Sequence, residues 1–278
     1  MNAIRTTVLV AVLVTPLVIA GEVDMASAQQ PNIRTKTYSG PYDSEISYPI
    51  VEGRIGQKDP AAMAEITATV ASISLPEQSA LELKGFVAHG SRDSDQRRPA
   101  SLVIESGSRF RMDIQESYGV GSVRISGGIG QMKRLNGATE PLVDIEYGDP
   151  LALPSQLLNI VDRADAAVIY DGRLVGGGRT MDKVTVTLFR PRVGGPLAAS
   201  FYFDPETHLL EKSVFVDRGA INHSLEVLRV VSYGDYRKEQ SITVPHEYLE
   251  TVNGHKLMTF TVTETDVTVR HDDTYFVF

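Results

Sequence analysis

Most of the chain alternates between apolar and polar residues with a period of two, and this pattern predicts β-strands. In RFRMDIQ (109–115), Phe110, Met112 and Ile114 share one side of the predicted strand, and charged residues occupy the other side. The alternation recurs in KVTVTLF (183–189), AASFYFD (198–204) and KLMTFTVTET (256–265). Such alternation is typical of antiparallel strands with one apolar face and one wetter face.

Two segments depart from this alternation and predict helices. In DPAAMAEITATVASI (59–73), Asp59 can cap the first turn, Pro60 suits the first helical position, and apolar residues recur at helical spacing. DPLALPSQLLNIVDR (149–163) predicts a helix or a pair of helical turns inserted between two groups of strands.

The window YGDYRKEQSITVPHEYLETVNG is rich in charge, yet its spacing favours a hairpin over a reaction site. Residues 235–238 are expected to form its turn, and His246, Glu247 and Glu250 to lie on strand surfaces. The pair Asn253-Gly254 then predicts a second tight turn, with a positive φ at the glycine.

The N-terminus predicts export. Residues 1–28 contain the basic Arg5, an apolar run of about fifteen residues and the small-residue sequence Ala26-Ser27-Ala28. The run is short for a membrane span, so the pattern predicts a signal peptide cleaved after residue 28, with an uncleaved anchor as the alternative.

The remaining chain is expected to hold one domain. Residues 29–59 are polar, lack sustained periodicity and predict a loosely ordered lead-in, and residues 60–278 predict a single folded domain.

Charge and cysteine content narrow the class of function. The formal net charge is −8, which gives no electrostatic support to nucleic-acid binding. The chain has no cysteine, so disulfides, thiolate nucleophiles and thiolate metal ligands are excluded. A large exported domain without cysteine suits a bacterial periplasm.

No motif for catalysis or metal binding is present. The six histidines include no HExxH motif and no pair at the i, i+4 spacing of a metal site on a helix, and there is no GxSxG elbow. The sequence His271-Asp272-Asp273 is expected to be a solvated tail. Carboxylates distant in sequence can still meet in a fold, so a hydrolase stays open as a minor alternative.

Two stretches carry a resemblance to a known family. FYFDPETHLLEKSVF (201–215) and VVSYGDYRKEQSITVPHEYLETVNGHKLMTFTVTETDV (230–267) resemble the bacterial lipoprotein-carrier superfamily of LolA- and LolB-like proteins. The resemblance lies in a serial order: a strand ending in Phe-Asp-Pro-x-Thr, a return strand, Tyr-x-Asp-Tyr-Arg, x-Val-Pro, and a final hairpin. It covers 201–278 well, and 60–278 as a pattern of elements.

This resemblance implies a mainly β (α+β) fold: a curved, antiparallel, incomplete β-barrel whose concave apolar face is covered by helices. It also implies a non-catalytic periplasmic protein without a cofactor, which binds lipid acyl chains or lipoproteins and has a membrane complex of the envelope as a further partner. The expected lipid-pocket residues are Phe110, Met112, Ile114, Leu188, Phe201, Phe203, Met258, Phe260 and Val262. The alternative is a structural or interaction module of the envelope, in which the same residues fill a packed core.

Overall fold

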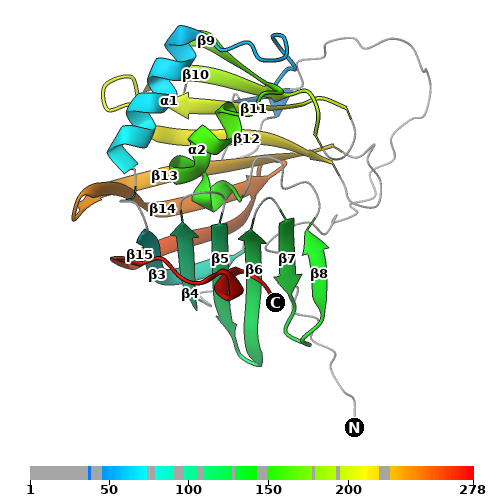
Figure 1. The fold of residues 1–278 in the computed structure, drawn as a ribbon, viewed down its shortest axis with the longest axis vertical. Helices are drawn as coiled ribbons and strands as arrows, with labels where there is room; N and C mark the ends of the chain where they lie inside the picture. The colour runs from blue at the N-terminus through cyan, green and yellow to red at the C-terminus, as the bar shows by residue number, and fades with distance from the viewer. Residues whose placement is uncertain are drawn as a thin grey trace.

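A single antiparallel sheet of 13 strands organises the described part of the protein in this computed structural model (Figure 1). The structure describes residues 37–38, 46–73, 75, 79–90, 97–105, 109–126, 129–142, 149–176, 179–191, 195–218 and 226–278. The predicted signal peptide (1–28) lies outside the described residues, as do 29–36 and 39–45 of the predicted lead-in.

The strands form two consecutive meanders. The first contains β3 (Ser79–His89), β4 (Arg98–Glu105), β5 (Arg109–Glu116), β6 (Gly119–Ser126), β7 (Ile129–Lys133) and β8 (Thr139–Leu142). The second contains β9 (Ala166–Gly176), β10 (Arg179–Leu188), β11 (Leu197–Phe203), β12 (Leu210–Arg218), β13 (Glu226–Glu239), β14 (Ile242–Val252) and β15 (His255–Val269). Because β15 pairs with β3, the meanders join in the middle of the sheet, and β8 and β9 are its two edges.

The sheet is open and strongly curved, as an incomplete barrel, and the bend lies at the β15–β3 pair. The backbones approach so closely at Gly85 that a Cβ there would lie 1.9 Å from the carbonyl oxygen of Thr261. The register shifts between Val262 and Glu264, and such irregularities bend a strand. Figure 1 shows the result: β9–β14 cross the upper half of the view, while β4–β8 run steeply through the lower half.

Two α-helices cover one face of the sheet. α1 (Pro60–Ile73) packs on β9, on β14 and on α2 (Leu153–Val161), which follows the 3₁₀ turn η1 (Pro150–Ala152). Both lie in front of the β9–β14 half in Figure 1. Their positions agree with the helices predicted in 59–73 and 149–163. The Asp59 side chain accepts the Ala61 N–H at 2.8 Å and so caps α1 as expected.

The predicted strands are found at β5, β10, β11 and β15, but the wet second face is wrong for the second half of β10, where Thr185 and Thr187 are buried, and for β11. Ser200 and Tyr202 of this strand point away from the helices and are nevertheless buried. Tyr202 packs with Val214 and Leu228, and Tyr48 of the lead-in lies against this cluster. The lead-in thus supplies a cover that periodicity alone does not reveal.

The charged window is a hairpin, as predicted, but its turn is displaced. The turn lies at Gln240 and Ser241, while residues 235–238 continue β13. The strand is held beyond the expected turn because the partly buried Tyr236 donates its hydroxyl proton to the Leu210 carbonyl oxygen at 2.6 Å. The second predicted turn is confirmed, with a φ of 73° at Gly254.

His246 and Glu250 are buried, which corrects their expected position on strand surfaces. The Glu250 carboxylate pairs with the Arg229 guanidinium at 3.0 Å, and His246 Nε2 lies 3.3 Å from a carboxylate oxygen of Glu239. The ionic partners make this burial tolerable.

The last part of the lead-in is bound to the edge strand β9. The Asp59 N–H donates to the Val168 carbonyl oxygen at 2.8 Å, and the Val168 N–H donates to the Gln57 carbonyl oxygen at 2.8 Å. The Lys58 ammonium donates to the carbonyl oxygens of Arg163 and Ala166 at 3.2 and 3.1 Å. These contacts cover part of an edge that would otherwise offer free backbone groups.

Candidate functional site

The concave face of the sheet is one continuous apolar surface, shared by both meanders and by the undersides of α1 and α2. The nine predicted pocket residues all lie in this cluster, and each is at most 3% exposed: Phe110, Met112, Ile114, Leu188, Phe201, Phe203, Met258, Phe260 and Val262. They come from β5, β10, β11 and β15. The structure therefore brings them to one face, where they pack as a core; contact with a ligand stays a prediction.

Aromatic rings stabilise the middle of this face. The rings of Tyr233 and Tyr248 meet edge to face with centroids 5.8 Å apart, and Tyr248 and Phe260 lie 5.7 Å apart. Phe201 and Phe215 form a second edge-to-face pair at 6.0 Å. Aromatic pairs in these orientations stabilise the fold beyond what the burial of their apolar area contributes.

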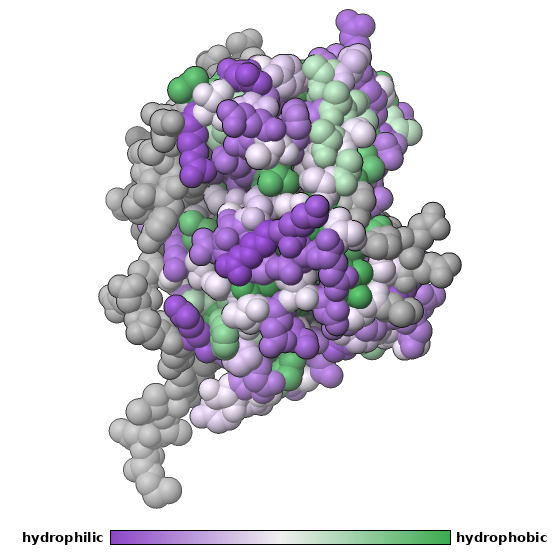
Figure 2. Space-filling model, turned by 90° about the vertical axis from the view of Figure 1, so that its left-hand side faces the viewer, coloured by the Kyte–Doolittle hydropathy of each residue, from purple (hydrophilic) through white to green (hydrophobic). Residues whose placement is uncertain are grey.

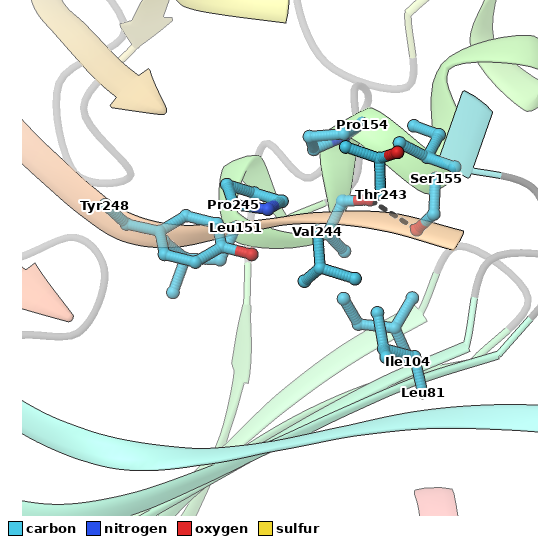
Figure 3. Close-up of a pocket in the computed structure, with 11 residues that line it drawn as sticks. Leu81, Ile104, Leu151, Pro154, Ser155, Thr243, Val244, Pro245 and Tyr248 are labelled. Carbon is cyan, nitrogen blue, oxygen red and sulfur yellow. Dashed lines mark hydrogen bonds between the residues drawn. The ribbon is translucent and has the colours of Figure 1, made fainter. Parts of the chain in front are cut away.

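A narrow crevice enters the apolar layer where α2 and η1 meet the two halves of the sheet (Figure 3). Helical residues line one side of it, β14 contributes a second wall, and β3 and β4 contribute the floor. The lining consists of Ile73, Leu81, Ile104, Leu151, Ala152, Pro154, Ser155, Thr243, Val244, Pro245 and Tyr248.

The crevice is small and almost wholly apolar. Its interior holds about 20 Å³, enough for one water molecule. Among the described residues, its lining includes no acidic, basic or histidine side chain, and the polar side chains there are the hydroxyls of Ser155, Thr243 and Tyr248. Burial raises the pKa of Tyr248, so this phenol is neutral at physiological pH. The described lining can therefore receive an apolar group.

Helix α1 is attached to the sheet by polar contacts at one point. Both carboxylate oxygens of the buried Glu65 lie 3.0 Å from His208 Nδ1 in the β11–β12 turn. The Thr69 hydroxyl donates to the His208 carbonyl oxygen. The rest of the inner face of the helix, including Ala62, Ile66 and Val70, makes apolar contacts.

Helix α2 is also held by polar contacts, and at its C-terminal end the Lys58 ammonium donates to the Val161 carbonyl oxygen. The helix has nine residues, and its N-cap residue Ala152 makes no side-chain capping bond. The Gln156 side chain donates to the Arg109 carbonyl oxygen at 3.3 Å, the long end of the hydrogen-bond range. An isolated helix of this length is marginal in water, so α2 depends on its apolar contacts with the concave face.

Neither a metal cluster nor a membrane-spanning helix occurs in the described part of the chain. No group of three or more His, Asp or Glu side chains there is placed to hold a metal ion. No described helix has the length and apolar content needed to cross a bilayer.

The crevice residues were not among the nine predicted positions. Two of its walls come from windows that the sequence marks for other reasons, the inserted helical segment (149–163) and the charged hairpin. The sequence feature that could have pointed to the crevice is a pair of prolines. Pro154 and Pro245 interrupt apolar runs, and both line the crevice. Sequence alone does not show that these two windows meet.

The outer surface beside the crevice offers no broad apolar patch on the side seen in Figure 2. This view shows the face at the left of Figure 1, where a hydrophilic band crosses the middle and the hydrophobic areas are small and separate. Isolated exposed apolar residues are normal for a soluble surface.

Comparison with solved structures identifies the fold. A domain from Vibrio parahaemolyticus described as an outer membrane lipoprotein-sorting protein matches with a TM-score of 0.52 at 8% identity, over 78% of this chain and 94% of that one. A LolA superfamily protein from Nitrosomonas europaea matches with a TM-score of 0.50 at 10% identity, over 78% and 97%. No family model and no curated protein matches the sequence. The protein thus has a LolA-like fold, which the sequence resemblance predicted.

Proposed function

We propose that this protein binds an acyl chain of a lipid or lipoprotein between the concave face of its sheet and its helices, and carries it in the periplasm without catalysis. The LolA-like fold supports this proposal, since the likeness includes a domain described as a lipoprotein-sorting protein. The observation that carries it is the apolar crevice, which leads from the edge of α2 into the concave face.

Binding requires the crevice to widen, because its present volume is far below that of an acyl chain. The N-terminal part of α2 is the segment to move, since its N-cap residue Ala152 makes no side-chain capping bond, whereas Lys58 holds the C-terminal end of the helix. Each methylene that leaves water contributes about 0.8 kcal/mol, so about ten buried methylenes contribute about 8 kcal/mol before the cost of opening. This is enough to hold one chain while this part of α2 is displaced.

Displacement of a fluorescent fatty acid tests the site. Thr243→Phe places a ring at the wall of the crevice, and we expect it to weaken fatty-acid binding at least tenfold. Thr259→Phe is the matched control, because Thr259 is also half-buried on a strand but lies on the opposite face from Phe260. Equal binding by both variants and wild type would exclude the crevice as the entrance.

The cellular part of the proposal has its own test. Protein recovered gently from the periplasmic fraction is expected to lack residues 1–28 and to carry a lipid-sized adduct in native mass spectrometry. An intact Met1 on membrane-embedded protein would contradict export as a soluble carrier, independently of lipid binding.

A structural or interaction module of the envelope is the second candidate, and the packing of the concave face favours it. All nine predicted pocket residues are buried against one another and against the helices, as expected for a filled core. A wild-type protein that binds no fatty acid and carries no co-purified lipid would support this candidate over the carrier.

A further inference from the structure

The convex face of the first meander carries a row of cations. Arg109 and Arg111 on β5 and Arg124 on β6 alternate with residues of the concave cluster and so point to the opposite side of the sheet. Arg111 and Arg124 are direct cross-strand partners. Like charges in this position repel; Asp113 pairs with Arg111 at 2.8 Å, and further partners for both guanidinium groups stabilise the pair.

The C-terminal strap, residues 270–278, occupies this row. Solvation was predicted for its segment His271-Asp272-Asp273, and Asp272 and Asp273 are indeed exposed. The strap nevertheless turns back after β15 through the 3₁₀ turn η2 (Asp273–Phe276) and contacts β5 and β6 (Figure 1). This docking has a physical reason: the strap offers a carboxylate and aromatic ring faces to the cations, which its sequence alone does not reveal.

Each cation of the row meets a complementary group of the strap. The Arg111 guanidinium lies 4.2 Å from the Tyr275 ring centroid and donates to the Tyr275 carbonyl oxygen at 3.3 Å. The Arg124 guanidinium lies 4.0 Å from the Phe278 ring centroid and donates to the Val277 carbonyl oxygen. Arg109 pairs with the Asp273 carboxylate at 2.5 Å. Cation–π and charge-assisted contacts of this kind recognise a peptide by its rings and its backbone.

The entry of the strap is fixed by a buried carboxylate. Glu105 on β4 is fully buried, and its oxygens accept the His271 backbone N–H at 2.6 Å and the Arg270 guanidinium at 3.1 Å. Phe276 then inserts between Ala80 and Val103 on the same convex side. The convex surface therefore offers three kinds of contact along the strap. A carboxylate accepts a backbone N–H, an apolar site receives a phenyl ring, and two guanidinium groups stack on aromatic rings.

The far end of the strap is held by side chains rather than by the sheet. No residue of the strap belongs to a β-strand, and Val277 and Phe278 are 48% and 40% exposed. The side chain of Asp273 is 86% exposed despite its ion pair. This is the contact pattern of a docked peptide, and separation of these residues from the surface breaks no strand pairing.

We propose that the convex face of β3–β6 is a docking site for an extended peptide of a partner protein in which acidic residues precede aromatic ones, and that the C-terminal strap occupies it in the absence of this partner. The arginine pair would select ring faces and carbonyl oxygens, and Arg109 would select the preceding carboxylate. Because the strap is part of the same chain, its effective concentration at this surface is high. It therefore competes with partner peptides for the surface and excludes those that bind weakly. This proposal is independent of lipid binding, which concerns the opposite face of the sheet.

A labelled peptide measures the site directly. The probe is fluorescein-HDDTYFVF, the sequence of residues 271–278, and the readout is anisotropy with the full-length chain. Tyr275→Ser/Phe278→Ser weakens the tethered strap, so this variant is expected to bind the probe at least tenfold more tightly than wild type. Addition of Arg111→Gln/Arg124→Gln to that variant is expected to remove at least tenfold of the affinity.

Controls separate docking from loosened folding. Tyr118→Ser removes an aromatic ring that is 88% exposed on the β5–β6 turn, and it is expected to bind the probe as wild type does. The reversed peptide FVFYTDDH is expected to bind at least tenfold more weakly than the probe. If the double serine variant loses its cooperative melting transition, Asp273→Lys replaces it, with at least threefold tighter probe binding expected.

Two results would overturn the proposal. The first is a folded, strap-weakened variant that binds the probe no more tightly than wild type. The second is a wild-type dimer in sedimentation that is lost in Tyr275→Ser/Phe278→Ser, since the site would then serve a second copy of this chain.

Discussion

Glu65 of helix α1 faces His208 of the β11–β12 turn, with Nδ1 of the imidazole 3.0 Å from each carboxylate oxygen. The contact joins the longer covering helix to a turn of the sheet across 143 residues of sequence. His208 adopts a φ of 57°, a conformation that orients both its ring and its carbonyl oxygen toward the helix. A single turn thus supplies two of the polar contacts of α1.

Glu65→Ala is expected to loosen α1 without unfolding the sheet. The substitution removes a hydrogen bond between charged or polar groups, for which a loss of about 1–2 kcal/mol is typical, and alanine keeps the helix propensity high. Amide hydrogen exchange of residues 62–70 should therefore become about tenfold faster, while the exchange of β13 and β14 stays unchanged.

Glu264→Ala is the control for this experiment. Glu264 pairs with Lys84 at 3.7 Å, and both side chains are largely exposed, so its loss should change exchange in α1 by less than a factor of about two. Equal exchange of α1 in wild type and Glu65→Ala would show that apolar contacts alone hold the helix.

The sheet bend predicts a large effect at one glycine. Gly85→Ala would place a Cβ 1.9 Å from the Thr261 carbonyl oxygen, and backbone on both sides must move to accept it. We expect a loss of at least about 2 kcal/mol in the free energy of unfolding. Gly234→Ala is the matched strand control, because its Cβ would meet its nearest neighbours at an ordinary 3.8 Å. Urea unfolding compares the two, and similar losses would mean that the bend tolerates separation of the strands.

Both helices, the β13–β14 hairpin and four of the other strands could be predicted from the sequence, since their signals are local. Alternation places β5, β10, β11 and β15, and the proline after Asp59 marks the start of α1. The β13–β14 turn was displaced because Tyr236 keeps its strand in the sheet through a contact with Leu210, 26 residues away. Local turn propensity carries no information about such a tertiary contact.

The site could be predicted only in part, for a related reason. The alternation identifies which side of each strand is apolar, so the nine predicted residues do share a face. The crevice, in contrast, depends on the meeting of Leu151, Val244 and Ile104 from three distant segments. The docked strap depends likewise on cross-strand placement of Arg111 and Arg124, which only the register of β5 and β6 reveals.

Acid should destabilise the protein through His89. Burial, and then the charge of Arg98, lower the pKa of His89 to about 4, from 6.5 for an exposed histidine. The unfolded chain therefore binds more protons than the folded one between these values, so stability falls as the pH drops from about 6.5 to 4. This group contributes a loss of at most about 3 kcal/mol.

His89→Gln isolates that contribution, because glutamine does not titrate. Urea unfolding of both proteins at pH 7 and pH 4 should show a smaller acid-induced loss for the variant. A wild type and variant that lose the same free energy over this interval would contradict a neutral, half-buried His89.

The final prediction separates a packed core from an open pocket at Phe260. This residue is fully buried and stacks at a tilt against Tyr248, whose opposite neighbour is Tyr233. Phe260→Ala should therefore cost about 3–5 kcal/mol in urea unfolding, through lost burial and the cavity left behind. Fatty-acid affinity, measured by displacement at a temperature where the variant is folded, should change less than in Thr243→Phe. If Phe260→Ala instead leaves stability within about 1 kcal/mol and abolishes binding, Phe260 lines an underfilled pocket, and the ligand lies deeper in the concave face than the crevice.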